Sequence, residues 1–303
     1  MFAVAPATPR LTAQGMRRVL VVVVLVCMAA CSWAAAAEPG AVGPEAEPLR
    51  EQPWLIPSPV SGVLMHAMLY RPDGPGPFPL AVINHGSEES ARARARQAPP
   101  SFPALTEWFV ARGYAVLVPE RPGHGRTGGT YLEAQGRCGS PDYVAAGRGT
   151  ARSIGAAIAY LTAQPFVSKA GVIVVGNSAG GWGALALAAE NPSYVSAVVN
   201  FAGGRGGRDR NRPNHNCSPD RLVTAAATFG ATAHIPTLWL YAENDSYFAP
   251  DLSGRMAAAF EAAGGRIEYH LVPPIAGDGH SLIQTAAAAW RPILSSFLER
   301  IGK

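Results

Sequence analysis

The sequence has 303 residues, of which 48% are hydrophobic and 15% charged, so the chain can bury a full core and is not disordered. Its formal net charge is +4, but three of its 25 basic residues, Arg10, Arg17 and Arg18, lie in the N-terminal leader. Without these three, 22 basic residues face 21 acidic ones. A nearly neutral chain gives no support for a nucleic-acid partner.

The N-terminal stretch predicts export. The basic pair Arg17-Arg18 precedes an unbroken apolar run at 19–30, which is too short to span a membrane, and small residues follow at 35–37. We therefore predict a signal peptide at residues 1–37, removed before Glu38. The product would be periplasmic or secreted.

Two features of this leader stay open. The stretch Met28-Ala29-Ala30-Cys31 resembles a bacterial lipoprotein box, in which Cys31 would carry the lipid and attach the protein to a membrane. A start at Met16 would also give the signal a tighter basic region than a start at Met1 does.

The four cysteines divide in the same way. Cys27 and Cys31 belong to the leader, which leaves Cys138 and Cys217 in the exported chain. Two cysteines in an oxidising compartment are expected to pair, so we predict a disulfide between Cys138 and Cys217.

The exported chain alternates apolar strands with helices. Residues 38–59 are rich in Pro, Glu and Ala and predict an extended lead-in to a domain at 60–303. The first strand, at 63–70, alternates imperfectly, as an antiparallel edge strand would. Buried strands follow at 80–84, 115–119, 172–175, 195–201, 237–241 and 266–272, with helices between them. This order predicts an α/β fold with a mostly parallel sheet of about eight strands, covered on both faces.

The strand at 172–175 leads into Gly176-Asn177-Ser178-Ala179-Gly180, which precedes an Ala- and Leu-rich helix. A Gly-x-Ser-x-Gly between strand and helix predicts a sharp turn that exposes the serine as a nucleophile. The flanking glycines are needed where strand and helix pass closely. Ser178 is the predicted nucleophile, although a structural Gly-rich turn would show the same pattern.

Two further residues follow later strands. Ser178, Asp245 and His280 each come just after a strand, so the carboxyl edge of the sheet brings them together. A serine hydroxyl needs a base to take its proton, and a histidine can act as that base near neutral pH. Asp245 would then orient the imidazole of His280. Glu243 and Asp278 remain alternative acids.

The strand at 80–84 ends in His85-Gly86-Ser87, a pattern typical of an oxyanion-hole loop. We predict the backbone N–H groups of Ser87 and Ala179 as the oxyanion donors. An ordinary strand-to-loop turn is the alternative.

Two later loops are expected at the rim of the site. The Gly-rich loop at 121–129 fits no phosphate-binding spacing, and its His124 is interpreted as structural. The irregular segment at 201–217 is long enough to cover the site. Its arginines, Arg205, Arg208, Arg210 and Arg212, are expected to be solvated, with recognition of an acidic substrate as the alternative.

The ordered motifs at 84–87, 176–180, 241–245 and 279–280 resemble an α/β-hydrolase of the dienelactone-hydrolase-like group, over residues 60–300. That resemblance implies a Ser-Asp-His esterase-type hydrolase with a backbone oxyanion hole and no cofactor. Dienelactone hydrolases carry cysteine as nucleophile, so Ser178 favours a carboxylic ester hydrolase acting on a small-molecule ester. A peptidase or amidase of the prolyl-oligopeptidase-like type and a non-catalytic binding protein on the same fold are the alternatives.

Overall fold

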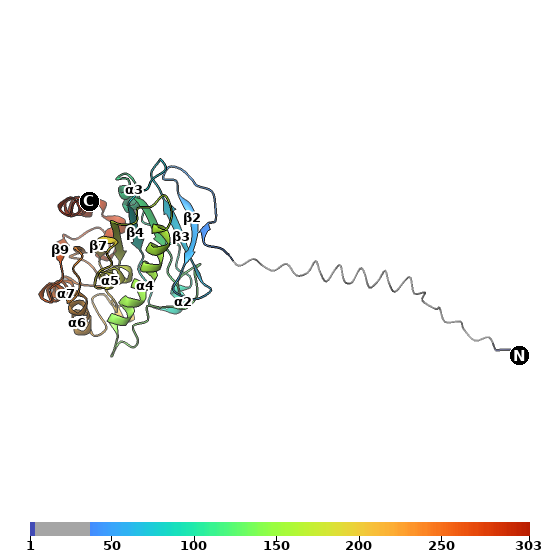
Figure 1. The fold of residues 1–303 in the computed structure, drawn as a ribbon. Coiled ribbons are helices and arrows are strands. Elements are labelled where there is room, and N and C mark those ends of the chain that lie inside the picture. The colour runs from blue at the N-terminus through green and yellow to red at the C-terminus, as the bar shows by residue number, and fades with distance from the viewer. Residues whose placement is uncertain (4–36) are drawn as a thin grey trace. The chain divides into compact units, whose positions relative to one another are not determined.

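Apolar, largely β-branched runs form the centre of a nine-stranded sheet (Figure 1). The computed structural model describes residues 1–3 and 37–303, so Met16, Cys31 and the apolar leader lie outside the described residues. The strands are β1 (Gly40–Ala41), β2 (Gln52–Pro57), β3 (Leu64–Tyr70), β4 (Leu80–Asn84), β5 (Ala115–Pro119), β6 (Val172–Asn177), β7 (Val195–Phe201), β8 (Thr237–Ala242) and β9 (Ile267–Val272).

The sheet order is β1-β2-β3-β5-β4-β6-β7-β8-β9. The pairs β1–β2, β2–β3 and β3–β5 are antiparallel, and all later pairs are parallel. The prediction of a mostly parallel sheet is therefore confirmed, with nine strands in place of about eight. As a consequence, the carboxyl ends of β4, β6, β7, β8 and β9 share one edge.

Residues 38–59 differ from the predicted lead-in, because they contribute β1 and β2 to the sheet. In β2, Trp54 and Ile56 are buried while their neighbours are partly exposed, which is the alternation of a half-covered strand. Pro53 and Pro57 obscured this pattern in the sequence, since proline is depleted in strands. Consequently β3 is an inner strand and not the expected edge.

Helices cover both faces of the sheet. They are α2 (Ala91–Arg94), α3 (Pro103–Val110), α4 (Tyr143–Thr162), α5 (Ala179–Ala188), α6 (Pro219–Gly230), α7 (Pro250–Ala262), α8 (Leu282–Thr285) and α9 (Ala287–Arg300), with short 3₁₀ turns η1 (Asp209–Asn211) and η2 (Gly279–Ser281). Side chains of α4–α7 pack on one face, and those of α3, α8 and α9 on the other. In β6, Val172 and Val174 point into the first layer and Ile173 and Val175 into the second, so this strand is buried on both sides.

A capping side chain fixes the start of the long helix α4. Asp142 is its N-cap, and its carboxylate accepts a hydrogen bond from the Ala145 N–H at 2.8 Å. Its apolar side packs against α5 and α6, and α5 begins directly after Ser178. The cap and the apolar stripe thus fix the helix that supports α5.

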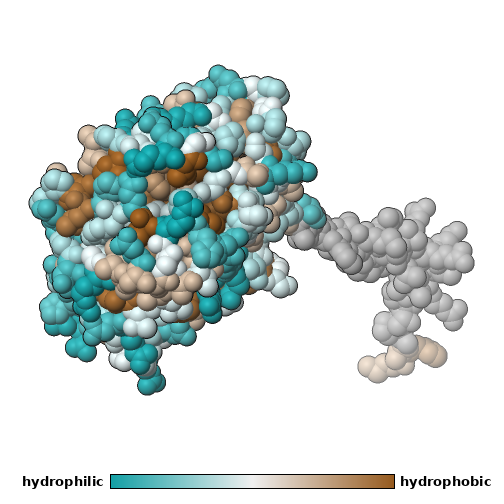
Figure 2. Space-filling view, turned by 60° about the vertical axis from the view of Figure 1, so that its left-hand side comes forward, coloured by the Kyte–Doolittle hydropathy of each residue, from teal (hydrophilic) through white to brown (hydrophobic). Residues whose placement is uncertain are grey.

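The surface is largely hydrophilic on the face drawn in Figure 2, where hydrophobic residues appear in separate patches. Within residues 37–303, Val42 and Leu271 are the large hydrophobic side chains that are exposed. No helix of the described residues has the length and hydrophobicity needed to cross a membrane.

Candidate active site

The turn between β6 and α5 holds Ser178 at φ 54° and ψ −121°, a conformation that residues other than glycine rarely adopt. Two glycines make the turn feasible. A Cβ on Gly176 would collide with the main chain of Gly180, and a Cβ on Gly180 would collide with the carbonyl of Asn84. The close crossing of strand and helix places Ser178 at the carboxyl edge of the sheet, in the arrangement expected of a nucleophile elbow.

A carboxylate and an imidazole that contact each other follow β8 and β9. Both carboxylate oxygens of Asp245 lie 3.2 Å from Nδ1 of His280. Asp245 is 1% exposed, and its Oδ1 also accepts the N–H groups of Tyr247 at 2.7 Å and Phe248 at 3.0 Å. The ring of Tyr247 stacks on the imidazole with centroids 4.0 Å apart. Because carboxylates only accept, Nδ1 carries the proton and Nε2 is free to act as a base.

The two alternative acids occupy different positions. Asp278 accepts hydrogen bonds from the N–H groups of Ser246 and His280 at 3.0 Å and from the Ser246 hydroxyl at 2.5 Å. Burial alone would raise the pKa of Asp278, but these hydrogen bonds outweigh burial and lower it. Glu243 is exposed, and its carboxylate has no hydrogen-bond or ion-pair partner among the described residues. Asp278 therefore shapes the turn before His280, while Asp245 contacts the ring.

The loop after β4 passes directly beside Ser178, the predicted nucleophile. A Cβ on Gly86 would lie 3.2 Å from Cβ and 3.7 Å from Oγ of Ser178. Across residues 37–303, the N–H groups of Ser87 and Ala179 have no acceptor, so both remain available to a ligand. The Ser178 hydroxyl also makes no hydrogen bond in the part of the chain described, including to His280. Such contacts are often long in free enzymes and tighten when substrate binds.

A cavity of about 440 Å³ opens at Ser178. Two chain segments supply much of its wall, residues 120–140 and 203–218, and we call them the covering segments. They contribute Tyr131, Gln135 and Arg205, while Tyr247 and Phe248 complete the side next to Asp245. The expectation that the segment after β7 covers the site agrees with this cavity.

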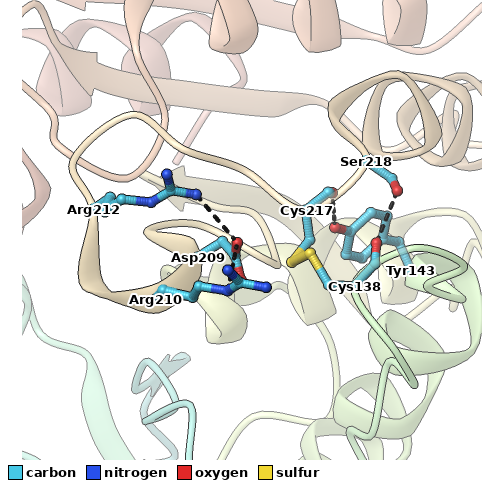
Figure 3. Close-up of a disulfide and its surroundings, with 7 residues drawn as sticks. All are labelled: Cys138, Tyr143, Asp209, Arg210, Arg212, Cys217 and Ser218. Carbon is cyan, nitrogen blue, oxygen red and sulfur yellow. Dashed lines mark hydrogen bonds and ion pairs between the residues drawn. A yellow bond between two sulfur atoms is a disulfide. The ribbon is translucent and has the colours of Figure 1, made fainter.

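The structure contains the expected Cys138–Cys217 disulfide, which joins the two covering segments (Figure 3). The Tyr143 hydroxyl donates to the Cys217 carbonyl, and the Ser218 hydroxyl donates to the Cys138 carbonyl at 2.8 Å. Within the described residues, Cys138, Cys217 and Asp209 are the one group with clustered metal-ligand side chains, but the two sulfurs are bonded to each other.

Arg205 contradicts the expectation of a solvated arginine. It is 8% exposed, and its guanidinium donates to Tyr131 at 2.7 Å, to Gln135 at 3.2 Å and to the Glu133 carbonyl at 2.5 Å. Its partners lie about 70 residues earlier in the chain, so the run of arginines gave no signal of burial. By contrast, Arg210 and Arg212 are exposed and lie 3.9 and 3.7 Å from Asp209.

The sequence also did not predict the buried ion pair that lies beneath the cavity. Arg121 is fully buried and lies 2.5 Å from Glu133, which in turn lies 3.4 Å from Arg205. Burial alone would raise the pKa of Glu133, but the charge and hydrogen bond of Arg121, with His124 and Arg205, outweigh it and lower the pKa to about 2. Each partner is an ordinary loop residue in sequence, so only the three-dimensional arrangement reveals the pair.

Two buried histidines lie next to this pair. Burial, aided by Arg121 and His124, lowers the pKa of His85 well below its usual value. Burial also lowers the pKa of His124 to about 4, with Glu133 opposing and Arg121 and Arg94 adding to the shift. Both rings are therefore neutral near pH 7. His124 is buried as expected of a structural residue, but it also contacts Ser87 at 2.9 Å.

Comparison with known families gives one match. The family model described as X-Pro dipeptidyl-peptidase (S15 family) matches residues 61–239, which is more than half of the chain. No curated protein matches the chain.

Several solved structures share the fold. An esterase, Pf2001, of Pyrococcus furiosus is similar over 87% of this chain and 99% of its own, with 15% identity and a TM-score of 0.61. A putative dienelactone hydrolase from Klebsiella pneumoniae is similar over 84% of this chain and 99% of its own, with 17% identity and a TM-score of 0.55. Dipeptidyl peptidase 4 of Porphyromonas gingivalis is similar over 84% of this chain but 35% of its own, with 15% identity and a TM-score of 0.60. The α/β-hydrolase fold predicted from the motifs is thus confirmed.

Proposed function

Since the chain belongs to the family described as X-Pro dipeptidyl-peptidase (S15 family), we propose that it is a serine hydrolase that cleaves a carboxylic ester through an acyl-enzyme. Ser178 is the nucleophile, His280 the general base and Asp245 the acid that orients the imidazole. The observation that carries this proposal is the Asp245–His280 hydrogen bond at the same edge of the sheet where Ser178 is held at positive φ. A hydrolase of esterase or peptidase type on this fold is the common ground of the family and its structural neighbours.

The reaction follows from the proton positions. With Nδ1–H directed at Asp245, the Nε2 lone pair of His280 takes the Ser178 proton as Oγ attacks the ester carbonyl. The carbonyl π electrons move onto oxygen, and the N–H groups of Ser87 and Ala179 stabilise that oxyanion, at about 3 kcal/mol for one donor. When the intermediate collapses, the alkoxide leaves and receives the proton from His280. Water then repeats the same steps on the acyl-enzyme.

An ester is the least demanding substrate for this site. An alkoxide leaves more readily than an amine, which must be protonated by His280 as the C–N bond breaks. A peptidase is the second candidate, and the description of the matching family favours it. A non-catalytic binding protein is the third candidate. It is disfavoured because a strained backbone such as that of Ser178 is typical of residues with a functional role.

We also propose that the protein is exported. The Cys138–Cys217 disulfide fits an oxidising compartment, and the leader has the charge and hydropathy of a signal. Intact mass and N-terminal sequence of the product should show a start at Glu38. A chain that begins at Cys31 and carries diacylglycerol would support the lipoprotein alternative and contradict cleavage before Glu38.

The hydrolytic proposal is tested with the 4-nitrophenyl ester and the 4-nitroanilide of one acyl group, together with an X-Pro dipeptide 4-nitroanilide. Ester cleavage is expected to be fastest. Ser178→Ala and His280→Gln should lower kcat by about 10⁴-fold or more, and Asp245→Asn by about 10⁴-fold.

Two acidic variants serve as matched controls for Asp245. Glu243→Gln should leave kcat within about two-fold, because an exposed side chain without partners contributes little. Asp278→Asn should act more weakly than Asp245→Asn, since Asp278 shapes the turn and does not contact the ring. Equal losses in Asp278→Asn and Asp245→Asn would contradict the assigned acid. Faster cleavage of the X-Pro anilide than of the ester would favour the peptidase.

A further inference from the structure

The buried ion pair beneath the cavity continues into a closed ring of hydrogen bonds. Arg121 contacts Glu133, and Glu133 contacts Arg205, at 2.5 and 3.4 Å. Arg205 then donates to the Tyr131 hydroxyl at 2.7 Å. The six members of this hydrogen-bond ring are Arg121, Glu133, Arg205, Tyr131, Ser87 and His124.

The second half of the ring reaches the oxyanion loop. The hydroxyl oxygens of Tyr131 and Ser87 are 3.0 Å apart, and Oγ of Ser87 lies 2.9 Å from Nε2 of His124. Nδ1 of His124 lies 3.2 Å from the Arg121 carbonyl, which closes the ring. Oγ of Ser87 also lies 3.4 Å from the Glu88 carbonyl, a longer contact that does not compete with His124.

The chemistry of the groups gives this chain of bonds one direction. A carbonyl only accepts, so Nδ1 of His124 carries the proton, and on a neutral ring Nε2 must accept from Ser87. The Ser87 proton is then used, so Tyr131 donates its own proton to Ser87. The guanidinium of Arg205 can only donate, so it supplies Tyr131. Aligned bonds of this kind polarise and strengthen one another.

Tyr131 is itself held in place. The guanidinium of Arg94 lies 3.7 Å from the centroid of its ring. A Cβ on Gly123, which has φ +83°, would lie 2.7 Å from Cα of Tyr131, so the loop packs tightly against this residue. The hydroxyl therefore has little freedom to choose other partners.

Ser87 is the point where the ring meets the proposed chemistry. Its neighbour Gly86 directs its carbonyl at Nδ1 of His85, 2.5 Å away, with Gln97 at 3.3 Å. In a trans peptide the C=O of one residue and the N–H of the next point in opposite directions. The Ser87 N–H therefore faces away from His85. The hydroxyl of the same residue is held by Tyr131 and His124.

We propose that Tyr131 and His124 are positioning residues, which fix the oxyanion donor of Ser87 through its hydroxyl and tie it to Arg205 in the covering segment at 203–218. This inference rests on the proposed function, because it concerns the donor for that reaction. Ser87 connects the hydrogen-bond ring to the reaction. Its backbone N–H stabilises the oxyanion, and the hydrogen bonds of its side-chain hydroxyl hold that N–H in place.

The test uses Ser87→Ala, Tyr131→Phe and the double variant, with a 4-nitrophenyl ester. Ser87→Ala keeps the backbone N–H of this residue and removes only its hydroxyl, which connects Tyr131 to His124. Each single variant should lower kcat by about 10-fold with KM nearly unchanged, because a displaced donor weakens binding of the transition state more than of the substrate. The double variant should fall no further than the lower single variant, since both changes break the same chain. Affinity for a trifluoromethyl ketone, whose adduct carries an oxyanion, should fall by the same factor.

Tyr194→Phe is the matched control, since it removes a partly buried hydroxyl that has no hydrogen bond among the described residues. It should leave kcat within about two-fold. Three results would overturn the proposal. They are a wild-type kcat in Ser87→Ala, a rise in KM without a fall in kcat in either single variant, and losses in kcat that multiply in the double variant. An inert wild type would contradict the proposed function itself, whereas an active wild type with an unaffected Ser87→Ala contradicts the positioning role alone.

The ring can also be tested without turnover. The measurement uses protein that carries ¹⁵N-histidine, with the His124 signals assigned from His124→Gln. The imidazole of His124 should be the neutral Nδ1–H tautomer at pH 7. Its Nε2 shift should move in Ser87→Ala, because that nitrogen loses its donor. A neutral Nε2–H tautomer or a charged ring would contradict the direction of the chain.

Discussion

The turn at Ser178 and the covering segments are stabilised by different kinds of interaction. At the turn, Ser178 is held by main chain against main chain, with Gly176 and Gly180 removing the side chains that would keep β6 and α5 apart. The covering segments have little regular structure and are held by buried charges and one disulfide. The difference teaches that the position of Ser178 depends on backbone sterics, while the shape of the cavity depends on a few long-range polar contacts.

The largest effect on stability should come from removing the buried ion pair between Arg121 and Glu133. Glu133→Gln leaves Arg121 buried without its anion, so the free energy of unfolding should drop by about 3–5 kcal/mol. Urea unfolding of both proteins measures the drop. Glu299→Gln is the control, since its carboxylate is exposed and has no ion pair within residues 37–303; it should change the free energy of unfolding by less than about 0.5 kcal/mol. If Glu133→Gln lowers the free energy of unfolding no more than the control does, the ion pair does not stabilise the covering segments.

The pH dependence sharpens the same point. The pKa of Glu133 is lowered from 4.5 to about 2, so its contribution is fully present above pH 4.5 and is lost as pH falls towards 2. The pKa of His124 is lowered from 6.5 to about 4, so its contribution is present above pH 6.5 and is lost as pH falls through 4. Wild-type unfolding free energy should therefore fall from pH 6.5 downwards, and Glu133→Gln should show a smaller slope below pH 4.5. Equal slopes would contradict the assignment.

The steric side of the comparison is tested by Gly180→Ala. Its Cβ would meet the Asn84 and His85 carbonyls, and main chain cannot move aside as a side chain can. We expect a loss of about 3 kcal/mol in unfolding free energy, together with lost activity. Gly254→Ala in α7 is the matched control, because no atom of the described part of the chain would lie within 4 Å of its added Cβ, and it should stabilise by about 0.5 kcal/mol. A Gly180→Ala protein as stable as wild type would show that the close crossing is not required.

The smallest of these stability effects should come from the disulfide. The Cys138→Ala, Cys217→Ala double variant removes a crosslink over 79 residues and should cost about 2 kcal/mol, the lower end of the usual range, because Cys138 lies in an exposed loop. Since the crosslink joins the covering segments and does not involve the turn at Ser178, KM should rise more than kcat falls. Ester kinetics of the double variant measure both. A fall in kcat with unchanged KM would place the disulfide's effect on the catalytic groups.

The same comparison explains what the sequence could predict. The turn at Ser178, the pair Asp245 and His280 and the loop at His85–Ser87 are short patterns at strand ends, so local rules could predict that they lie at one edge of the sheet. The contact of Arg205 with Glu133 spans 72 residues and leaves no periodic trace, so Arg205 was expected to be solvated. Residues 52–57 form a strand despite two prolines, because pairing with β3 outweighs their weak local preference.

The most direct test of the account is labelling with a fluorophosphonate probe, followed by mapping of the labelled peptide. Ser178 should carry the label in wild type, labelling should be absent in Ser178→Ala, and it should be strongly slowed in His280→Gln and Asp245→Asn. Ser178→Ala should remain folded, as judged by unchanged circular dichroism. A folded wild-type protein that takes up no label, or a label on a residue other than Ser178, would contradict the central claim that Ser178 is an activated nucleophile.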